Sequence, residues 1–393
     1  MCHRIVQEVI FAQDVLLVSG HQAVPLTVID SILKLVLHNP DWNRSPMSDV
    51  VRDMFKQVIP MLQARTEIQR GNRPNLSQLL HDFQEWDATD PKDHVYSLVG
   101  LASTPGLVPN YTKTVVEVFT DATVAVIVES TSLDAICFDQ DDSFSHDEFK
   151  LPTWVPNYAI HHGQAGAVRA RATWPNIFAA GRGCTSTKML LSQDHTLLEI
   201  QGLSIDYLDR VFEVNGEDSV NWHSQVFKLI PQFSDHNGLS NVSSSEHDAT
   251  ISTLILGQMD PSNRATNLSI LRPDFIHWCH FNAMATSEST KQPPIPPSRF
   301  LQALERHRLS RPRRMFAITK NHRYLTSVHA GAEPGDEICV LPSASIPLVV
   351  RPIETNQHGM TCARIGTAYV YGIMDGEAWD HPDRYPQRLY TMV

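Results

Sequence analysis

The sequence predicts an α+β protein, in which a helical N-terminal half packs against a β-rich C-terminal half. Three observations support this prediction. Apolar residues recur at helical spacing through residues 1–130, short β-type runs follow one another near the C-terminus, and 42% of the 393 residues are hydrophobic. We expect roughly the last 80 residues to form a small antiparallel sheet or barrel.

The first 22 residues predict a helix and then a buried strand. Val6, Val9 and Ile10 have the i, i+3, i+4 spacing of one helix face. The apolar run Val15–Gly20 is typical of a short buried strand that ends at glycine.

Residues 24–86 predict three helices. Their apolar faces run through Ile29–Val36, Val51–Ile59 and Leu76–Phe83. Pro60 should stop or kink the second helix.

The stretch Asp87–Ala102 (DATDPKDHVYSLVGLA) predicts one short, well-delimited helix. Asp90 can cap it, Pro91 suits its first position, and the charge of an aspartate in the first turn suits the helix dipole. Gly100 can end the helix in a left-handed conformation.

A further helix should begin near Thr114, because Thr114 and Glu117 have the spacing of a capping box. The acidic segment Asp139–Lys150 predicts a loop. The proline-rich segment Leu151–Asn157 fits an edge segment and not a central strand.

The middle of the chain mixes strands, a helix and polar segments. Leu197–Leu203 and Val211–Val214 predict two strands joined by a turn or short bend around Asp206–Asp209. Leu271–Met284 predicts a docked helix. Residues 232–262 and 285–298 are polar, and we expect them to be the least ordered.

Five short β runs lie near the C-terminus and are separated by turn residues, which is typical of a small antiparallel sheet or barrel. They are Met315–Thr319, Tyr324–Val328, Glu337–Leu341, Ile346–Val350 and Ile365–Ile373.

Composition excludes several classes of protein. The formal charge of −11 argues against general nucleic-acid binding, and charged or polar residues interrupt every long apolar run, so we expect no membrane span. Neither a CxxC pair nor a disulfide framework occurs, which favours reduced thiols in a cytoplasmic protein and no metal site. The six cysteines are Cys2, Cys137, Cys184, Cys279, Cys339 and Cys362.

Six motifs, in order, resemble those of fungal heterokaryon incompatibility (HET) domain proteins. Together they span most of the chain, and the set is more specific than any single motif. They are Asp87–Ala102, Pro109–Asp121, Leu151–Asn157, Glu333–Leu341, Ile346–Arg351 and Gly366–Glu377.

At its N-terminus the chain differs from the family pattern. The HET domain is similar to TIR domains, and here only Arg4–Val9 resembles its last helix, with Ile5 in place of a tryptophan. The resemblance therefore implies a chain that lacks most of the TIR-like domain. By analogy with NAD-cleaving TIR enzymes, Glu8 is a weak catalytic candidate, whose alternative interpretation is an exposed glutamate on a helix face.

On this basis we expect four regions. Residues 1–22 are a remnant of the TIR-like HET domain, 23–130 a helical region with the family hallmark, 131–310 a mixed α/β region with mobile loops, and 311–393 a C-terminal β-rich module.

Other polar groups have structural interpretations that we favour. Asp90, Asp93 and Tyr96 suit a helix start. The pairs His161–His162 and His277–His280 lack the spacing of a zinc site.

The glycines before Asp336 and around Asp375 fit turns between strands, in which both aspartates accept neighbouring backbone N–H groups. Single tryptophans fit core or domain-interface packing: Trp154, Trp174, Trp278 and Trp379.

Two hypotheses of function follow. The preferred one is a non-catalytic HET-family protein of fungal non-self recognition and cell death, with another protein as its incompatibility partner and no cofactor. The alternative is an enzyme or accessory protein acting on a small molecule, which a deep apolar pocket with converging polar groups would support.

Overall fold

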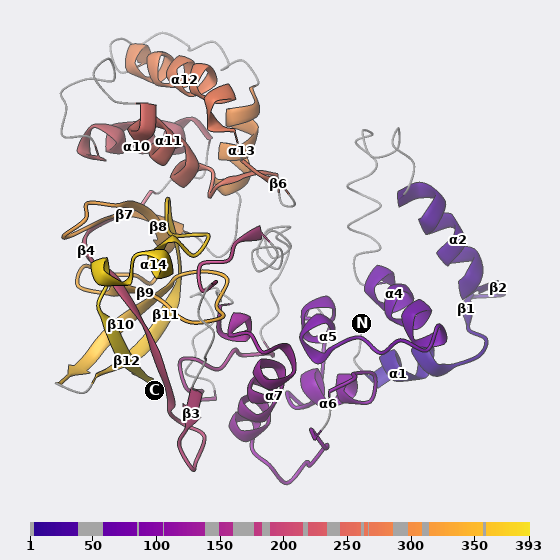
Figure 1. Cartoon of the computed structure of the whole chain (residues 1–393). Coiled ribbons are helices and arrows are strands. Elements are labelled where there is room, and N and C mark those ends of the chain that lie inside the picture. Colours follow the sequence, from indigo (N-terminus) through magenta and orange to yellow (C-terminus); the bar gives the residue numbers. More distant parts are fainter. Residues whose placement is uncertain are drawn as a thin grey trace. The chain divides into compact units, whose positions relative to one another are not determined.

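The computed structural model describes most of the chain, which divides into two compact units (Figure 1). The described residues are 4–37, 58–84, 86–104, 106–137, 149–159, 177–182, 189–214, 219–233, 244–260, 263–265, 267–285, 298–308, 314–356 and 359–393. The predicted α+β class is confirmed.

Unit 1 comprises Met1–Ser130 and Asn157–Gly163, and its described residues form helices and one hairpin. Its elements are α1 (Arg4–Phe11), β1 (Leu16–Ser19), β2 (Gln22–Pro25), α2 (Leu26–Leu37), α4 (Val58–Gln69), α5 (Leu76–Asp82), α6 (Asp93–Val99) and α7 (Val115–Ser130).

Helix α1 is anchored to two neighbouring helices by side-chain hydrogen bonds, one from its middle and several at its C-terminal end. Gln7 Nε2 donates to the carbonyl of Ser97 at the end of α6, at 2.8 Å. The buried guanidinium of Arg65, on α4, donates to the carbonyls of Val9, Ile10 and Gln13. These bonds satisfy acceptors that the C-terminal turn of a helix leaves open.

The sequence predictions for unit 1 need three corrections. The strand after α1 exists, but β1 is exposed because it pairs only with β2 in a two-stranded hairpin. Pro60 lies in the first turn of α4, where proline is tolerated, so it does not end this helix. Residues 51–57 lie outside the described part. Gly100 has φ −65°, so α6 does not end in a left-handed residue.

Unit 2 comprises Thr131–Pro156 and Gln164–Val393. Its strands are β3 (Met189–Leu191), β4 (Leu198–Phe212), β5 (Gln258–Asp260), β6 (Asn263–Arg264), β7 (Arg314–Thr319), β8 (Leu325–His329), β9 (Glu337–Val340), β10 (Leu348–Thr355), β11 (Met360–Val370) and β12 (Gln387–Met392). Its helices are η2 (Asp134–Ile136), α10 (Ser219–Phe233), α11 (Ser244–Leu254), η5 (Leu268–Ile270), α12 (Arg272–Ala285), α13 (Arg299–Arg308), α14 (Glu377–Asp380) and η6 (Pro382–Arg384).

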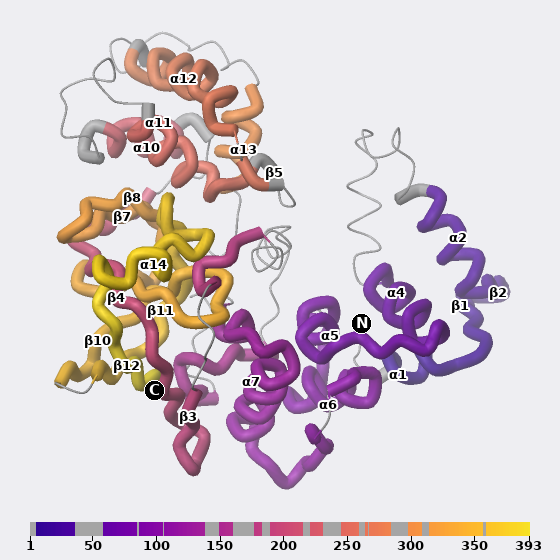
Figure 2. The backbone as a smooth tube through the Cα atoms, in the orientation of Figure 1, coloured from indigo at the N-terminus to yellow at the C-terminus, as the bar shows by residue number. Residues whose placement is uncertain are grey.

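Six strands of unit 2 close into a ring of antiparallel pairs. The order β4–β7–β8–β11–β10–β9 returns to β4, so each strand has a partner on both edges. Strand β12 fills the space between the N-terminal halves of β4 and β11, and Figure 2 shows it beside β4. Closure removes unpaired strand edges.

Strand β4 corrects the prediction of two separate strands, and it agrees with the predicted bend around Asp206–Asp209. Residues 198–212 form one strand of 15 residues. Register shifts at Ser204/Asp206 and Leu208/Arg210 mark bulges that bend it. The bend lets β4 pair first with β12, then β9, and finally β7.

A group of helices, α10–α13, lies between β4 and β7 in the chain and gathers beside β7 and β8 (Figure 1). Its core is rich in large aromatic side chains, and Phe316 of β7 belongs to the same cluster. We predicted that residues 232–262 are among the least ordered. This prediction is wrong for α11, because its Ile251 and Leu254 are fully buried. Residues 234–243 and 286–297 lie outside the described part, as does most of the acidic loop 139–150.

The four cysteines in the described residues are buried and form no disulfide with one another. Burial raises the pKa of the Cys279 and Cys362 thiols to about 12 and that of Cys339 well above its usual value. A buried thiol of raised pKa is a poor nucleophile.

Candidate functional site

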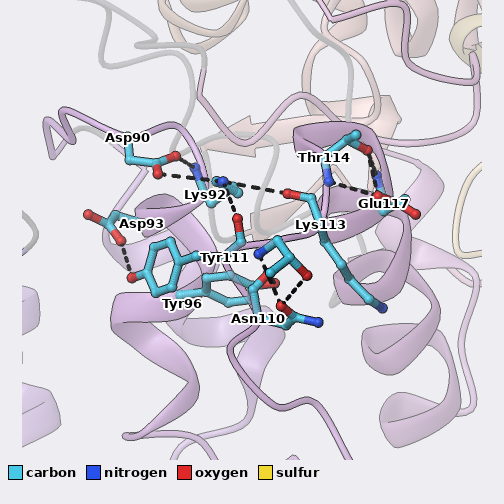
Figure 3. Close-up of polar contacts among 10 residues, drawn as sticks. Asp90, Lys92, Asp93, Tyr96, Asn110, Tyr111, Lys113, Thr114 and Glu117 are labelled. Atoms are coloured by element: carbon cyan, nitrogen blue, oxygen red, sulfur yellow. Dashed lines mark hydrogen bonds and ion pairs between the residues drawn. The ribbon is translucent and has the colours of Figure 1, made fainter.

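The two signature motifs of unit 1 meet at the start of α6, where Figure 3 shows a network of polar side chains. The motif Asp87–Ala102 supplies the turn before α6 and the helix itself. The motif Pro109–Asp121 supplies the loop before α7 and its first turn. This junction brings together polar residues that the sequence singled out in both motifs.

Lys92 connects the two motifs through its ammonium group. Its Nζ donates to the carbonyl of Tyr111 at 3.0 Å and that of Lys113 at 3.5 Å, and lies 5.6 Å from the centre of the Tyr111 ring. Oδ2 of Asp90 lies 3.7 Å from the same Nζ atom. Asp90 Oδ1 also accepts from the backbone N–H of Lys92, so it caps the turn before α6. The helix begins at Asp93, two residues later than the predicted first position.

Two tyrosines fix the same junction from opposite directions. Tyr111 donates its hydroxyl to Oδ1 of the buried Asp93 at 2.6 Å, and Tyr96 donates to the carbonyl of Asn110 at 3.0 Å. The two rings meet edge to face with centroids 5.2 Å apart. This geometry is the favourable one for an aromatic pair.

The predicted capping box at the start of α7 is present. Glu117 Oε2 accepts from the backbone N–H of Thr114 at 2.7 Å, and the Thr114 hydroxyl accepts from the backbone N–H of Glu117 at 3.2 Å. The hydrogen bonds from Thr114 hold the pKa of Glu117 below its usual value. Lys113 pairs with Asp121 in the second turn of α7, which raises the pKa of the Lys113 ammonium group.

These contacts give the junction a structural role. Its ammonium, carboxylate and phenol groups bind backbone or side-chain partners of the same unit, and its carboxylates accept hydrogen bonds that stabilise helix starts. A general base or a nucleophile needs access to a substrate, and here these partners occupy the polar groups. The junction therefore stabilises the fold of unit 1.

The weak catalytic candidate, Glu8, lies elsewhere, on the exposed side of α1. Val6 and Ile10 lie two residues to either side of Glu8, about 200° around the helix from it, and both are buried, so Glu8 points away from the packed face. The contacts of α1 with α4 and α6 thus lie on the side of the helix that is opposite this carboxylate. A catalytic role for Glu8 stays a prediction.

A cavity of about 730 Å³ lies between α2, α4, α5 and the loop before α5. Its size suits a small molecule. Its cations, however, already have partners. Lys34 pairs with Asp30 at 2.6 Å, Arg70 with Glu67 at 2.9 Å, and Arg73 donates to a backbone carbonyl at 3.1 Å. Among the described residues, no aromatic side chain lines it. It is not the deep apolar pocket with converging polar groups that the small-molecule hypothesis requires.

The closed ring of unit 2 holds a buried polar cluster that the sequence did not reveal. Glu337, with no exposed surface, accepts hydrogen bonds from Arg388 Nη1 and from the Tyr390 hydroxyl, each at 2.7 Å. Arg388 Nη1 also donates to Tyr207 at 2.7 Å. Burial raises the pKa of Tyr390 well above its usual value, so the phenol stays a donor. An acidic residue inside a β run has no sequence signal that distinguishes this burial from exposure.

Of the two turn aspartates, Asp336 bonds to its own turn as predicted and Asp375 does not. Asp336 accepts the backbone N–H of Glu333 at 2.8 Å, as predicted. Asp375 instead forms a two-bond pair with the Arg264 guanidinium, so the prediction of a local turn contact is wrong for this residue.

The remaining predictions concern histidines and tryptophans. No group of three or more His, Cys, Asp or Glu residues within the described ranges could hold a metal ion. Trp154 Nε1 donates to the carbonyl of Thr196 at 3.2 Å, and Trp278 is fully buried among the aromatic residues of the helical group. Both therefore serve packing. The pair His161–His162 and Trp174 lie outside the described part.

Comparison with known families gives one match. The model of the Het-6 beta-barrel domain matches residues 299–388, which include α13, the strands β7–β11 and the start of β12. No curated protein and no solved structure matches the chain. No helix in the described ranges is both long and apolar enough to cross a membrane. The matched region supports a relation to heterokaryon-incompatibility-type proteins.

Proposed function

We propose that this chain is a non-catalytic protein of fungal non-self recognition, of the heterokaryon-incompatibility type, that recognises another protein in the cytoplasm. The observation that carries the proposal is the match of residues 299–388 to the Het-6 beta-barrel domain. The same residues supply five of the six strands of the closed ring.

The structural role of the junction in unit 1 supports the non-catalytic part of the proposal. Asp93 and Tyr96 lie in the most specific motif, yet both are buried and bonded to the motif that follows. Residues 4–22 form a helix and part of a hairpin within unit 1. We propose that residues 1–22 are what this chain holds of a TIR-like domain, and that the four predicted regions are its functional divisions.

An assay of NAD⁺ turnover tests the non-catalytic part. We expect no release of nicotinamide by the purified chain beyond that of a buffer control. Turnover that is lost in Glu8→Ala and kept in Glu354→Ala, an exposed glutamate on β10, would show that the chain is an enzyme. Circular dichroism of both variants controls for folding.

A fusion assay tests the recognition part. Two fungal strains that differ only in residues 299–388 of this protein are allowed to fuse, and dying compartments are counted with a vital dye. We expect more cell death in mixed fusions than in self fusions. Equal death in both, with the protein expressed in both strains, would refute a role in recognition.

A further inference from the structure

The hairpin of unit 1 exposes an unusually apolar strand. In β1, Leu16, Leu17 and Val18 are 61%, 46% and 70% exposed. Successive side chains of a strand point to opposite faces, so both faces of β1 are exposed and apolar. A two-stranded hairpin is marginally stable in water without further strands or packing.

The register of the hairpin shows which backbone groups face outward. A two-residue turn with Gly20 at φ +60° joins the strands, and Ser19 lies opposite Gln22. The pair that closes such a turn exchanges both hydrogen bonds, and bonded pairs then alternate along the ladder. Leu16 and Val18 therefore direct their N–H and C=O groups away from β2.

The two edges of the hairpin differ. On β2, Pro25 lacks an N–H group, which blocks pairing at that edge, as edge prolines do in many proteins. On β1 neither proline nor lysine is present. Within the described residues, β1 pairs with β2 alone. The β1 edge is therefore able to accept another strand.

We propose that two copies of this chain associate through antiparallel pairing of β1 with β1. A twofold axis through Leu17 places Leu16 of one copy opposite Val18 of the other. The outward N–H and C=O groups of both residues then exchange hydrogen bonds with their counterparts, which makes the strand self-complementary. The result is a four-stranded sheet with the two blocked β2 edges outermost.

Apolar area and charge favour a second copy as the occupant. The neighbouring helix α2 exposes an apolar stripe of Val28, Ile32 and Leu35 at helical spacing. Contiguous exposed apolar surface of this kind is typical of a protein–protein interaction site. Residues 12–25 carry one acidic residue, Asp14, and no Lys or Arg, so little repulsion opposes self-pairing despite the chain's charge of −11.

Cysteine cross-linking tests the register. In the proposed pairing the two Leu17 residues form a non-hydrogen-bonded pair with Cα atoms about 4.5 Å apart, within the range that a disulfide spans. We expect Leu17→Cys, with Cys2 and Cys184 replaced by serine, to form a disulfide-linked dimer under mild oxidation. Val18→Cys is the matched control, because its copies lie about 7–8 Å apart, at or beyond that range.

A measurement of the oligomeric state tests whether β1 forms the interface between two copies. We expect light scattering to give twice the monomer mass of 44.2 kDa at high protein concentration. Leu17→Lys should give the monomer mass, whereas Val108→Lys should not, since Val108 is a 74% exposed apolar residue on another segment of unit 1. Circular dichroism shows whether each variant is folded.

Three results would overturn the proposal. The first is a monomer mass in light scattering at every protein concentration. Protection of the β1 amides from hydrogen exchange would not rescue the proposal in that case. The second is a dimer that Leu17→Lys does not dissociate, which would place the interface elsewhere. The third is equal cross-linking of Leu17→Cys and Val18→Cys, which would exclude a β1–β1 pairing with its twofold axis through Leu17.

Discussion

The buried carboxylate of Glu337 makes a sharp prediction about unit 2. Replacing Arg388 with methionine removes the cation 2.7 Å from this fully buried group and leaves it only phenol groups of the cluster, such as the Tyr390 hydroxyl, as partners. Breaking a buried pair from one side costs about 3–5 kcal/mol because the other charge stays buried. At about 2–4 °C per kcal/mol for a unit of this size, Arg388→Met should lower the melting temperature by roughly 6–20 °C.

A double-mutant cycle identifies the cause of this loss. Adding Glu337→Gln to Arg388→Met removes the stranded charge while the amide oxygen still accepts from Tyr390. We expect the double variant to recover at least about 1 kcal/mol relative to Arg388→Met in urea unfolding. Arg323→Met is the control, since this arginine is 45% exposed and should change stability by less than about 0.5 kcal/mol. An Arg388→Met cost below about 1 kcal/mol, or strictly additive losses, would refute the reasoning.

Four further changes test other contacts. Arg65→Ala should destabilise unit 1 by about 2–3 kcal/mol and speed amide exchange in α1, whose last carbonyls lose their donor. Tyr111→Phe should cost about 1–2 kcal/mol in chemical unfolding, compared with no change for Tyr371→Phe on the surface. Burial works against ionisation of Asp206, but the N–H donors of the turn before β8 outweigh it and lower its pKa. The stability that Asp206→Asn removes is therefore present above about pH 4 and is lost as the pH falls through the folded pKa, which a pH series of unfolding curves measures. Burial lowers the pKa of His223, so the unfolded chain binds a proton first below about pH 6.5, stability falls as acid is added, and His223→Phe should flatten that slope.

Local patterns predicted the elements whose cause is local. The capping box at Thr114 and Glu117 specifies the start of α7 through contacts three residues apart, and the structure reproduces it. The five β runs near the C-terminus all became strands because alternation and turn residues are local as well. For the same reason Asp336 behaved as predicted.

Distant contacts account for the predictions that were wrong or incomplete. Polar composition concealed α11, which Ile251 and Leu254 attach to the core of the helical group. The Asp375 carboxylate pairs with Arg264, 111 residues away in the sequence, and not with backbone N–H groups of its own turn. Glu337 gains its partners only when β12 pairs with β4. Each outcome depends on tertiary packing, which overrides local preference.

The long strand β4 has a consequence for synthesis in the cell. It leaves the ribosome about 100 residues before β7, the first of the later strands that complete the ring, and at roughly 5–20 residues per second it waits about 5–20 s for that strand alone. During that time its apolar residues, such as Leu203 and Ile205, lack the neighbours that bury them in the finished ring. A nascent chain interrupted between α10 and α13 should therefore be a preferred chaperone substrate.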